Sequence, residues 1–147
     1  MMTTYLISHE NGEHKEYSNK KIAKFLYNNL DRFGDKQEFI LKAIDYAMNP
    51  AKGGFVLIAV DADEIVGAVV INKTGMDGYI PSNILVYIAV RSDQRGKGVG
   101  KKLMLEAMSN TSGGVALHVE PDNPAKKLYE KLGFTNKYLE MRYQPSN

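Results

Sequence analysis

The sequence of 147 residues contains no cysteine. Without a thiol the chain cannot form a disulfide, a zinc–thiolate site or a thiol nucleophile. It also lacks an apolar run of the about 18 residues that a membrane-spanning helix requires. The longest apolar runs, Phe55–Val60 and Ile84–Val90, have the length of strands. No cluster of histidines and carboxylates has the spacing of a metal site.

Net charge is also small. The chain has 19 basic and 17 acidic residues, a formal charge of +2, which is too little to bind a polyanion by bulk charge. Hydrophobic residues make up 44% and charged residues 24%, a composition typical of a soluble globular protein. The length predicts one domain over residues 1–147. Met1–Glu10 has no basic region followed by an apolar stretch, so we expect a cytoplasmic protein.

Apolar periodicity predicts a mixed sheet with helices packed on it, in the order β-α-α-β-β-β-α-β-α-β. The expected strands and hairpins are Thr3–Ser8, Phe55–Val60 with Ile65–Ile71, Ile84–Val90, Val115–Val119 and Phe134–Tyr143. The expected helices run from Ser18 to about Leu30, from before Phe39 to Pro50, from the glycine turn to Gly113-Gly114, and from Pro124 to Leu132.

Local signals support several of these elements. Ser18 suits the N-cap of the first helix. The segment Asp61–Glu64 is typical of a tight turn between antiparallel strands. Three- and four-residue spacing predicts one buried face on the second helix, formed by Phe39, Ile40, Ala43, Ile44 and Ala47.

The most informative stretch runs from Arg91 to Lys102, between a buried strand and a helix, and contains Gly96, Gly98 and Gly100. Glycine permits positive φ and a close approach of the backbone to a ligand. The first amides of a helix lack partners within it and favour an anion. The stretch has five basic residues and one acidic residue, a net charge of +4. Such focused charge favours a small polyphosphate over a broad nucleic-acid surface.

Two familiar phosphate-binding turns do not fit this stretch. The P-loop requires serine or threonine after Gly-Lys, whereas Lys102 follows Gly100 and Lys101. The dinucleotide-binding turn requires glycine or alanine at the sixth position, where Lys101 or Leu103 stands.

A third pattern, R/Q-x-x-G-x-G/A, is matched by Arg95, Gly98 and Gly100. The strand Ile84–Val90 precedes it, and the block Asn123–Phe134 (NPAKKLYEKLGF) follows. Over roughly Ile84–Phe134 the chain thereby resembles the GNAT superfamily of N-acetyltransferases. The resemblance implies an α/β fold with a mixed, mostly antiparallel central sheet and helices on both faces. It also implies acetyl-CoA as the acyl donor and no metal.

The resemblance further implies where the cofactor binds. Amides of the glycine turn would hold the pyrophosphate, and the pantetheine arm would enter where the strand ending at Val90 and the strand starting at Val115 splay apart. The Val90 amide would bond the pantetheine or polarise the thioester. Tyr129 would be catalytic, as proton donor to the leaving thiolate. The implied cofactor-binding residues are Ile88, Ala89, Val90, Arg95, Gly96, Lys97, Gly98, Val99, Gly100, Lys101, Asn123 and Tyr129.

Several of these residues have a structural alternative. The glycines can simply open a helix. Asn123 can act only as an N-cap before Pro124. Tyr129 can be a core residue beside Leu128 and Leu132. No carboxylate stands out in the strand Ile84–Val90, so the general base is left unassigned.

The sequence thus predicts an acetyl-CoA-dependent N-acetyltransferase that acts on a primary amine of a small molecule or peptide by direct attack. The alternative is a non-catalytic acyl-CoA-binding sensor or interaction module of the same fold. An RNA-binding domain is disfavoured, because aromatic residues do not alternate with the basic residues of the turn. We expect neither nucleic acid nor membrane as a partner. Oligomeric state stays open, a homodimer included.

Position in the sequence is the basis for predicting which residues lie near the acceptor. The glycine-containing loop Lys73–Ser82 leads into the strand beside the expected thioester, so we expect it to help select the acceptor. Tyr79, Asn83 and Tyr87 are expected to border the acceptor pocket.

Overall fold

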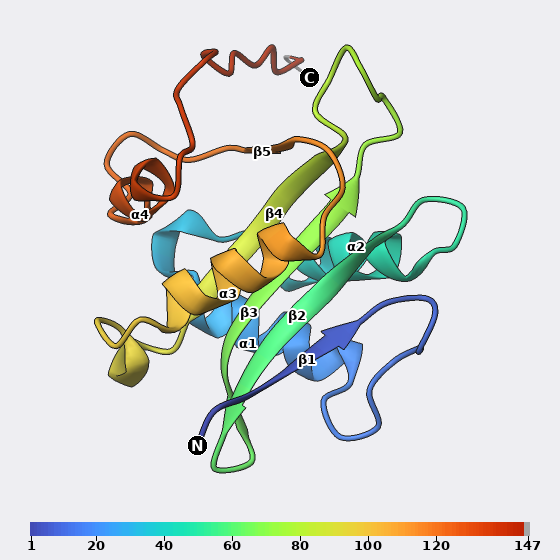
Figure 1. The fold of residues 1–147 in the computed structure, drawn as a ribbon, viewed down its shortest axis with the longest axis vertical. Coiled ribbons are helices and arrows are strands. Elements are labelled where there is room, and N and C mark those ends of the chain that lie inside the picture. The colour runs from blue at the N-terminus through green and yellow to red at the C-terminus, as the bar shows by residue number, and fades with distance from the viewer. Residues whose placement is uncertain (146–147) are drawn as a thin grey trace. The chain divides into compact units, whose positions relative to one another are not determined.

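The computed structural model describes residues 1–145 and divides into two compact units, Met1–Leu117 and His118–Asn147 (Figure 1). In the first unit the elements are β1 (Thr3–Ile7), α1 (Asn19–Asn29), η1 (Asp31–Phe33), α2 (Gln37–Met48), β2 (Gly54–Asp61), β3 (Glu64–Lys73), β4 (Asn83–Val90), η2 (Ser92–Gln94), α3 (Val99–Ser109) and β5 (Val115–Leu117). The second contains α4 (Ala125–Lys131). That residues 1–147 form one domain stays a prediction.

The sheet has five strands in the order β1-β2-β3-β4-β5. The first three pairings are antiparallel and the last is parallel, which confirms the mixed, mostly antiparallel sheet. The tight β2–β3 turn is possible because Ala62 and Asp63 both adopt positive φ, 50° and 62°. Two such residues give the turn whose twist matches that of the paired strands.

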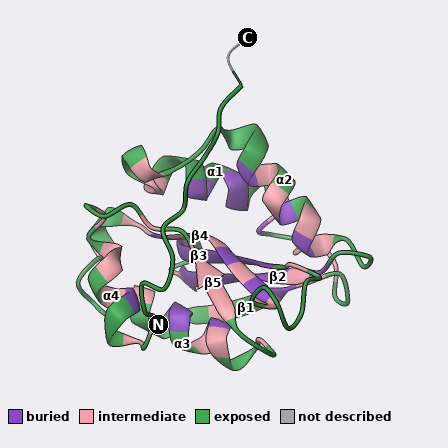
Figure 2. Cartoon of the chain, turned by 90° about the horizontal axis from the view of Figure 1, so that it is seen from above, coloured by how far each residue is buried: buried purple, intermediate pink, exposed green. Residues whose placement is uncertain are grey.

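Helices cover both faces of this sheet, as expected (Figure 2). On one face, buried side chains of α1 and α2 pack against alternate residues of β2, β3 and β4. Helix α3 covers the other face. Ser18 caps α1 as predicted, since its hydroxyl accepts a hydrogen bond of 3.3 Å from the Lys21 amide.

Gly67 lets α3 approach the sheet closely. A Cβ atom at Gly67 would lie 2.6 Å from Leu103 Cδ1 and 3.2 Å from Val99 Cγ1. Farther along α3, the Glu106 carboxylate accepts hydrogen bonds of 2.9 and 3.0 Å from the Thr4 hydroxyl on β1. These contacts hold α3 across the strands, with its first residue near the end of β4.

Two expectations were wrong. Phe39 does not join the buried face of α2: it is 42% exposed, and the ammonium groups of Lys36 and Lys42 lie 5.8 and 5.5 Å from its ring centroid. It lies one residue, or about 100°, from Ile40 at the centre of the apolar stripe.

The expected strand or hairpin at Phe134–Tyr143 is absent, because residues 134–145 have no strand structure. The apolar side chains in this segment are exposed; they are Tyr138, Leu139, Met141 and Tyr143. An alternating pattern forms a strand only when a neighbouring strand supplies backbone partners. Two elements also end earlier than expected, α3 at Ser109 and β5 at Leu117. Within residues 1–145 no helix combines the length and the apolar character that crossing a membrane requires.

We predict that Gly67→Val destabilises the protein by about 1–3 kcal/mol, the usual cost of overpacking a core. The added methyl groups would meet Leu103 and Val99 under α3. Chemical denaturation measures the loss. The matched control is Gly114→Ala, where the new Cβ would meet Pro81 at an ordinary 3.6 Å. Equal stability of the two variants would contradict the close packing of α3.

Candidate active site

The β4–β5 pair is only partly formed. Pairing joins Asn83–Leu85 to Val115–Leu117 and stops there. β4 continues to Val90 and stays paired with β3 on one side. On its other side, no described strand pairs with Val86–Val90, and we call this side the open edge. The pairing therefore stops in the region where the resemblance implies a cofactor arm.

The hydrogen-bond ladder shows which groups face this open edge. The Arg91 amide donates to the Val66 carbonyl at 2.9 Å, and the register places Val90 opposite Gly67 and Ala89 opposite Ala68. In an antiparallel pair, alternate residues bond to the partner while the others direct their backbone groups away from it. Ile88 and Val90 therefore direct their amides and carbonyls to the open edge. Ala89 faces β3 and has a buried side chain.

The glycine turn continues from this edge into α3. Gly96 and Gly98 have φ of 79° and 83°, a region that other residues rarely adopt, and a Cβ at either position would meet nothing within 4 Å. α3 begins at Val99 with no side-chain cap and no acidic residue in its first turn. Its first amides therefore point into space without a side-chain acceptor, which is how a helix start binds an anion.

Charge at the turn is smaller than the sequence count suggests. Arg91 donates to Asp93 at 2.7 and 3.1 Å and to Glu64 at 2.8 Å, and Arg95 pairs with Asp31 at 3.2 Å. The hydrogen bond from Arg91 is the main cause that lowers the pKa of Asp93. Two of the five basic side chains are thus already paired. The exposed lysines of the stretch, Lys97, Lys101 and Lys102, supply its remaining positive charge.

Asn123 acts as a cap in the second unit. Its Oδ1 accepts a hydrogen bond of 2.9 Å from the Ala125 amide at the start of α4. This is the structural role that the sequence left open. A contact between Asn123 and the cofactor stays a prediction.

The hydrogen bonds at the C-terminal end of α4 fix the position of Tyr129. Gly133, with φ of 99°, donates from its amide to the Glu130 carbonyl at 3.1 Å, and the Phe134 amide donates to the Tyr129 carbonyl at 3.0 Å. This pair of bonds defines a Schellman motif, which a contact between the residues at its two ends often accompanies. Here the rings of Tyr129 and Phe134 lie 6.0 Å apart. The Gly-Phe ending of the motif thus orients the tyrosine.

Tyr129 is 6% exposed, and burial raises the pKa of its hydroxyl to about 12. The hydroxyl is therefore protonated at neutral pH and can donate a proton or a hydrogen bond. Whether it meets a thiolate stays a prediction.

The residues expected beside the acceptor separate into different roles. The Tyr87 hydroxyl donates to Asp35 at 2.9 Å, and burial together with this bond raises the pKa of Tyr87. The side-chain amide of Asn83 donates through Nδ2 to the carbonyls of Ser112 and Gly114 at 2.8 and 3.2 Å, so it fixes the loop before β5. Tyr79 is 77% exposed. Sequence reasoning missed Asp35, because nothing local links it to a strand 52 residues away.

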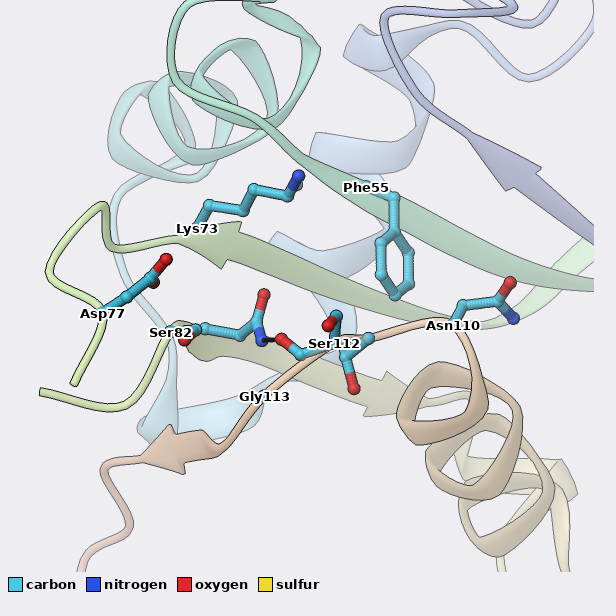
Figure 3. Close-up of a pocket in the computed structure, with 10 residues that line it drawn as sticks. Phe55, Lys73, Asp77, Ser82, Asn110, Ser112 and Gly113 are labelled. Carbon is cyan, nitrogen blue, oxygen red and sulfur yellow. Dashed lines mark hydrogen bonds between the residues drawn. The ribbon is translucent and has the colours of Figure 1, made fainter.

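A cavity of about 310 Å³ lies at the start of β4 (Figure 3). Its lining residues are Gly54, Phe55, Lys73, Asp77, Ser82, Asn83, Asn110, Thr111, Ser112 and Gly113. Along a strand, Asn83 lies about 17 Å from Ile88. A small amine in this cavity would not reach a thioester at the open edge. Within residues 1–145, no three potential ligand side chains of His, Cys, Asp or Glu come together as a metal site.

Comparison with known proteins defines the class. Residues 51–136, more than half of the chain, match the model of the acetyltransferase (GNAT) domain family. The chain therefore belongs to the GNAT acetyltransferase family. No curated protein matches its sequence.

Solved structures show the same fold at low sequence identity. A transcriptional regulator from Bacillus halodurans C-125 is 19% identical, with a TM-score of 0.69 over 98% of this chain and 99% of that one. An aminoglycoside N-acetyltransferase in complex with CoA is 17% identical, with a TM-score of 0.69 over 99% and 95%. A ribosomal-protein-alanine N-acetyltransferase from Brucella melitensis biovar Abortus 2308 is 16% identical, with a TM-score of 0.63 over 98% and 99%.

We predict that Gly98→Val abolishes CoA binding, because a side chain at this turn blocks the approach of pyrophosphate to the amides. Calorimetry with CoA measures the loss. Gly12→Val is a matched control: Gly12 has φ of 74° and open space around it, and it lies beyond β1 at the far edge of the sheet. Both variants carry the same kind of backbone strain. Equal CoA affinity in the two folded variants would reject the turn as the phosphate site. Pantetheine, which lacks the pyrophosphate, should bind weakly to the wild type.

The loop Lys73–Ser82 provides a second prediction. Its base is held by bonds from the Thr74 amide to the Ser82 carbonyl and from the Thr74 hydroxyl to the Pro81 carbonyl. Replacing its tip, Met76–Tyr79, should therefore leave the base intact and alter acceptor preference more than CoA affinity. The loop lies at the start of β4, about 17 Å along the strand from Ile88. We therefore expect acceptor preference to change for extended acceptors such as peptides. Loss of CoA affinity with an unchanged acceptor profile would contradict this role.

Proposed function

We propose that the protein is an N-acetyltransferase that moves an acetyl group from acetyl-CoA to a primary amine of a small molecule or peptide. The observation that carries the proposal is the open edge of β4. Two outward amides, from Ile88 and Val90, lead directly into a left-handed glycine turn and an uncapped helix start. An extended arm that ends in a pyrophosphate is complementary to this arrangement.

The chemistry needs little from the protein. A neutral amine nitrogen attacks the thioester carbon, the C–S bond breaks, and the sulfur leaves as a thiolate. A lysine side chain has a pKa of about 10.4 and an α-amine about 8, so the acceptor must lose a proton before it attacks. An outward amide of the open edge, from Ile88 or Val90, suits the oxygen on which negative charge develops. Direct transfer requires no enzyme nucleophile, which agrees with a chain that has no cysteine.

A thioester-release assay tests the proposal. Acetyl-CoA is supplied with a panel of polyamines, amino acids, peptides and aminoglycosides, and release of the CoA thiol is measured. Turnover above the rate without protein, with any acceptor, supports the enzyme. CoA binding without turnover across the panel favours the sensor of the same fold.

Tyr129→Phe tests the proton donor. The change keeps the ring and its packing against Phe134 but removes the hydroxyl. We expect turnover to fall by about 10²-fold, the lower range for lost acid catalysis, with little change in CoA affinity. Turnover and melting temperature are measured together. A variant with wild-type turnover and a slightly altered melting temperature would mean that Tyr129 is only a core residue.

A further inference from the structure

Arg95 uses its side chain to bridge two backbone ends. Its Nε donates to the Val90 carbonyl at 2.9 Å, and its Nη2 donates to the Asn29 carbonyl at 3.0 Å. Its Nη1 donates to Asp31 Oδ2 at 3.2 Å. All three contacts are with protein atoms, so the planar guanidinium is oriented before any phosphate arrives.

The first contact closes one position of the open edge. The Val90 carbonyl faces that edge by the alternation of the β3–β4 ladder, and it already accepts the hydrogen bond from Arg95 Nε. Of the outward groups of Ile88 and Val90, the two amides and the Ile88 carbonyl remain on this edge. A chain that pairs with β4 can therefore align in fewer ways.

The other two contacts hold the end of α1. Asn29 is the last residue of that helix, and its carbonyl lies among the four that have no partner within the helix. Asp31 follows with φ of 55°, a conformation uncommon outside glycine that aspartate adopts more often than most residues. A cation at this place also interacts favourably with the helix dipole. One side chain thus fixes the end of α1 to the end of β4.

We propose that Arg95 is a positioning residue that sets the register of the cofactor arm on β4 and is not a phosphate ligand. The inference rests on the proposed binding of CoA. With the Val90 carbonyl occupied, the arm pairs with Ile88 and with the Val90 amide, which places its thioester at one point along the strand. Phosphate binding is left to the amides of the glycine turn and the exposed lysines.

Side-chain geometry provides a sharp test. Glutamine carries its Nε2 the same number of bonds from Cα as the Nε of arginine, so Arg95→Gln can keep the bond to Val90 without any charge. Arg95→Lys keeps the charge but places its ammonium one atom farther along the chain. Arg95→Met removes both. A positioning role and a phosphate role therefore predict opposite orders for the glutamine and lysine variants.

Calorimetry with CoA and with ADP separates the two roles, because ADP has a pyrophosphate but no pantetheine arm. We expect Arg95→Gln to bind CoA within about twofold of the wild type, and Arg95→Lys and Arg95→Met to lose about fivefold, the usual worth of one hydrogen bond. All three variants should bind ADP as the wild type does. The contacts with Asn29 and Asp31 are weakened in every variant, so a general loss of stability cannot produce this order.

Three results would overturn the proposal. They are retention of CoA affinity in Arg95→Lys with loss in Arg95→Gln, a parallel loss of ADP affinity, and equal CoA affinity in all variants. A wild type that binds neither CoA nor ADP would instead reject the proposed function itself. Asp31→Asn serves as a further control: it removes the ion pair at α1 and should leave CoA affinity unchanged.

Discussion

The unequal lengths of β4 and β5 impose the constraint that the rest of the site depends on. A strand in a sheet normally satisfies its backbone groups on both sides. β4 does so only along Asn83–Leu85, and beyond that point its outer amides require another partner. The packing of α3 on Gly67 then places a helix start beside this edge. The end of β4 and the start of α3 thus both present backbone amides, and this arrangement does not depend on side chains.

Charge adds less to this site than backbone geometry does. Arg91 and Arg95 stabilise the turn and its neighbours through Glu64, Asp93 and Asp31. Exposed pairs of this kind contribute little stability, but they hold side chains in defined orientations. We therefore expect the turn to bind anions mainly through backbone amides, whose protonation does not change with pH. Its lysines are left to add attraction at longer range.

Most of the predictions that the structure confirms rest on interactions between residues close in sequence. Ser18 caps α1, and residues 61–64 form the expected hairpin turn, because caps and tight turns depend on neighbouring residues. Glycine spacing and the family motif also located the turn itself. The carboxylates that pair with Arg95 and Tyr87 lie 64 and 52 residues away, and no local pattern reveals them. The error at Phe134–Tyr143 has the same origin, since a strand depends on a distant partner that periodicity does not specify.

The Gly-Phe pair at the end of α4 determines how the Tyr129 hydroxyl is oriented. Gly133 reverses the chain in a left-handed conformation, and Phe134 consequently returns onto the Tyr129 ring. The ring thus takes its direction from the point at which its own helix stops. Insertion of one residue before Gly133 would rotate the tyrosine by about 100° relative to that stop. The length of this short helix is therefore as much a determinant of where the hydroxyl points as the identity of the residue that carries it.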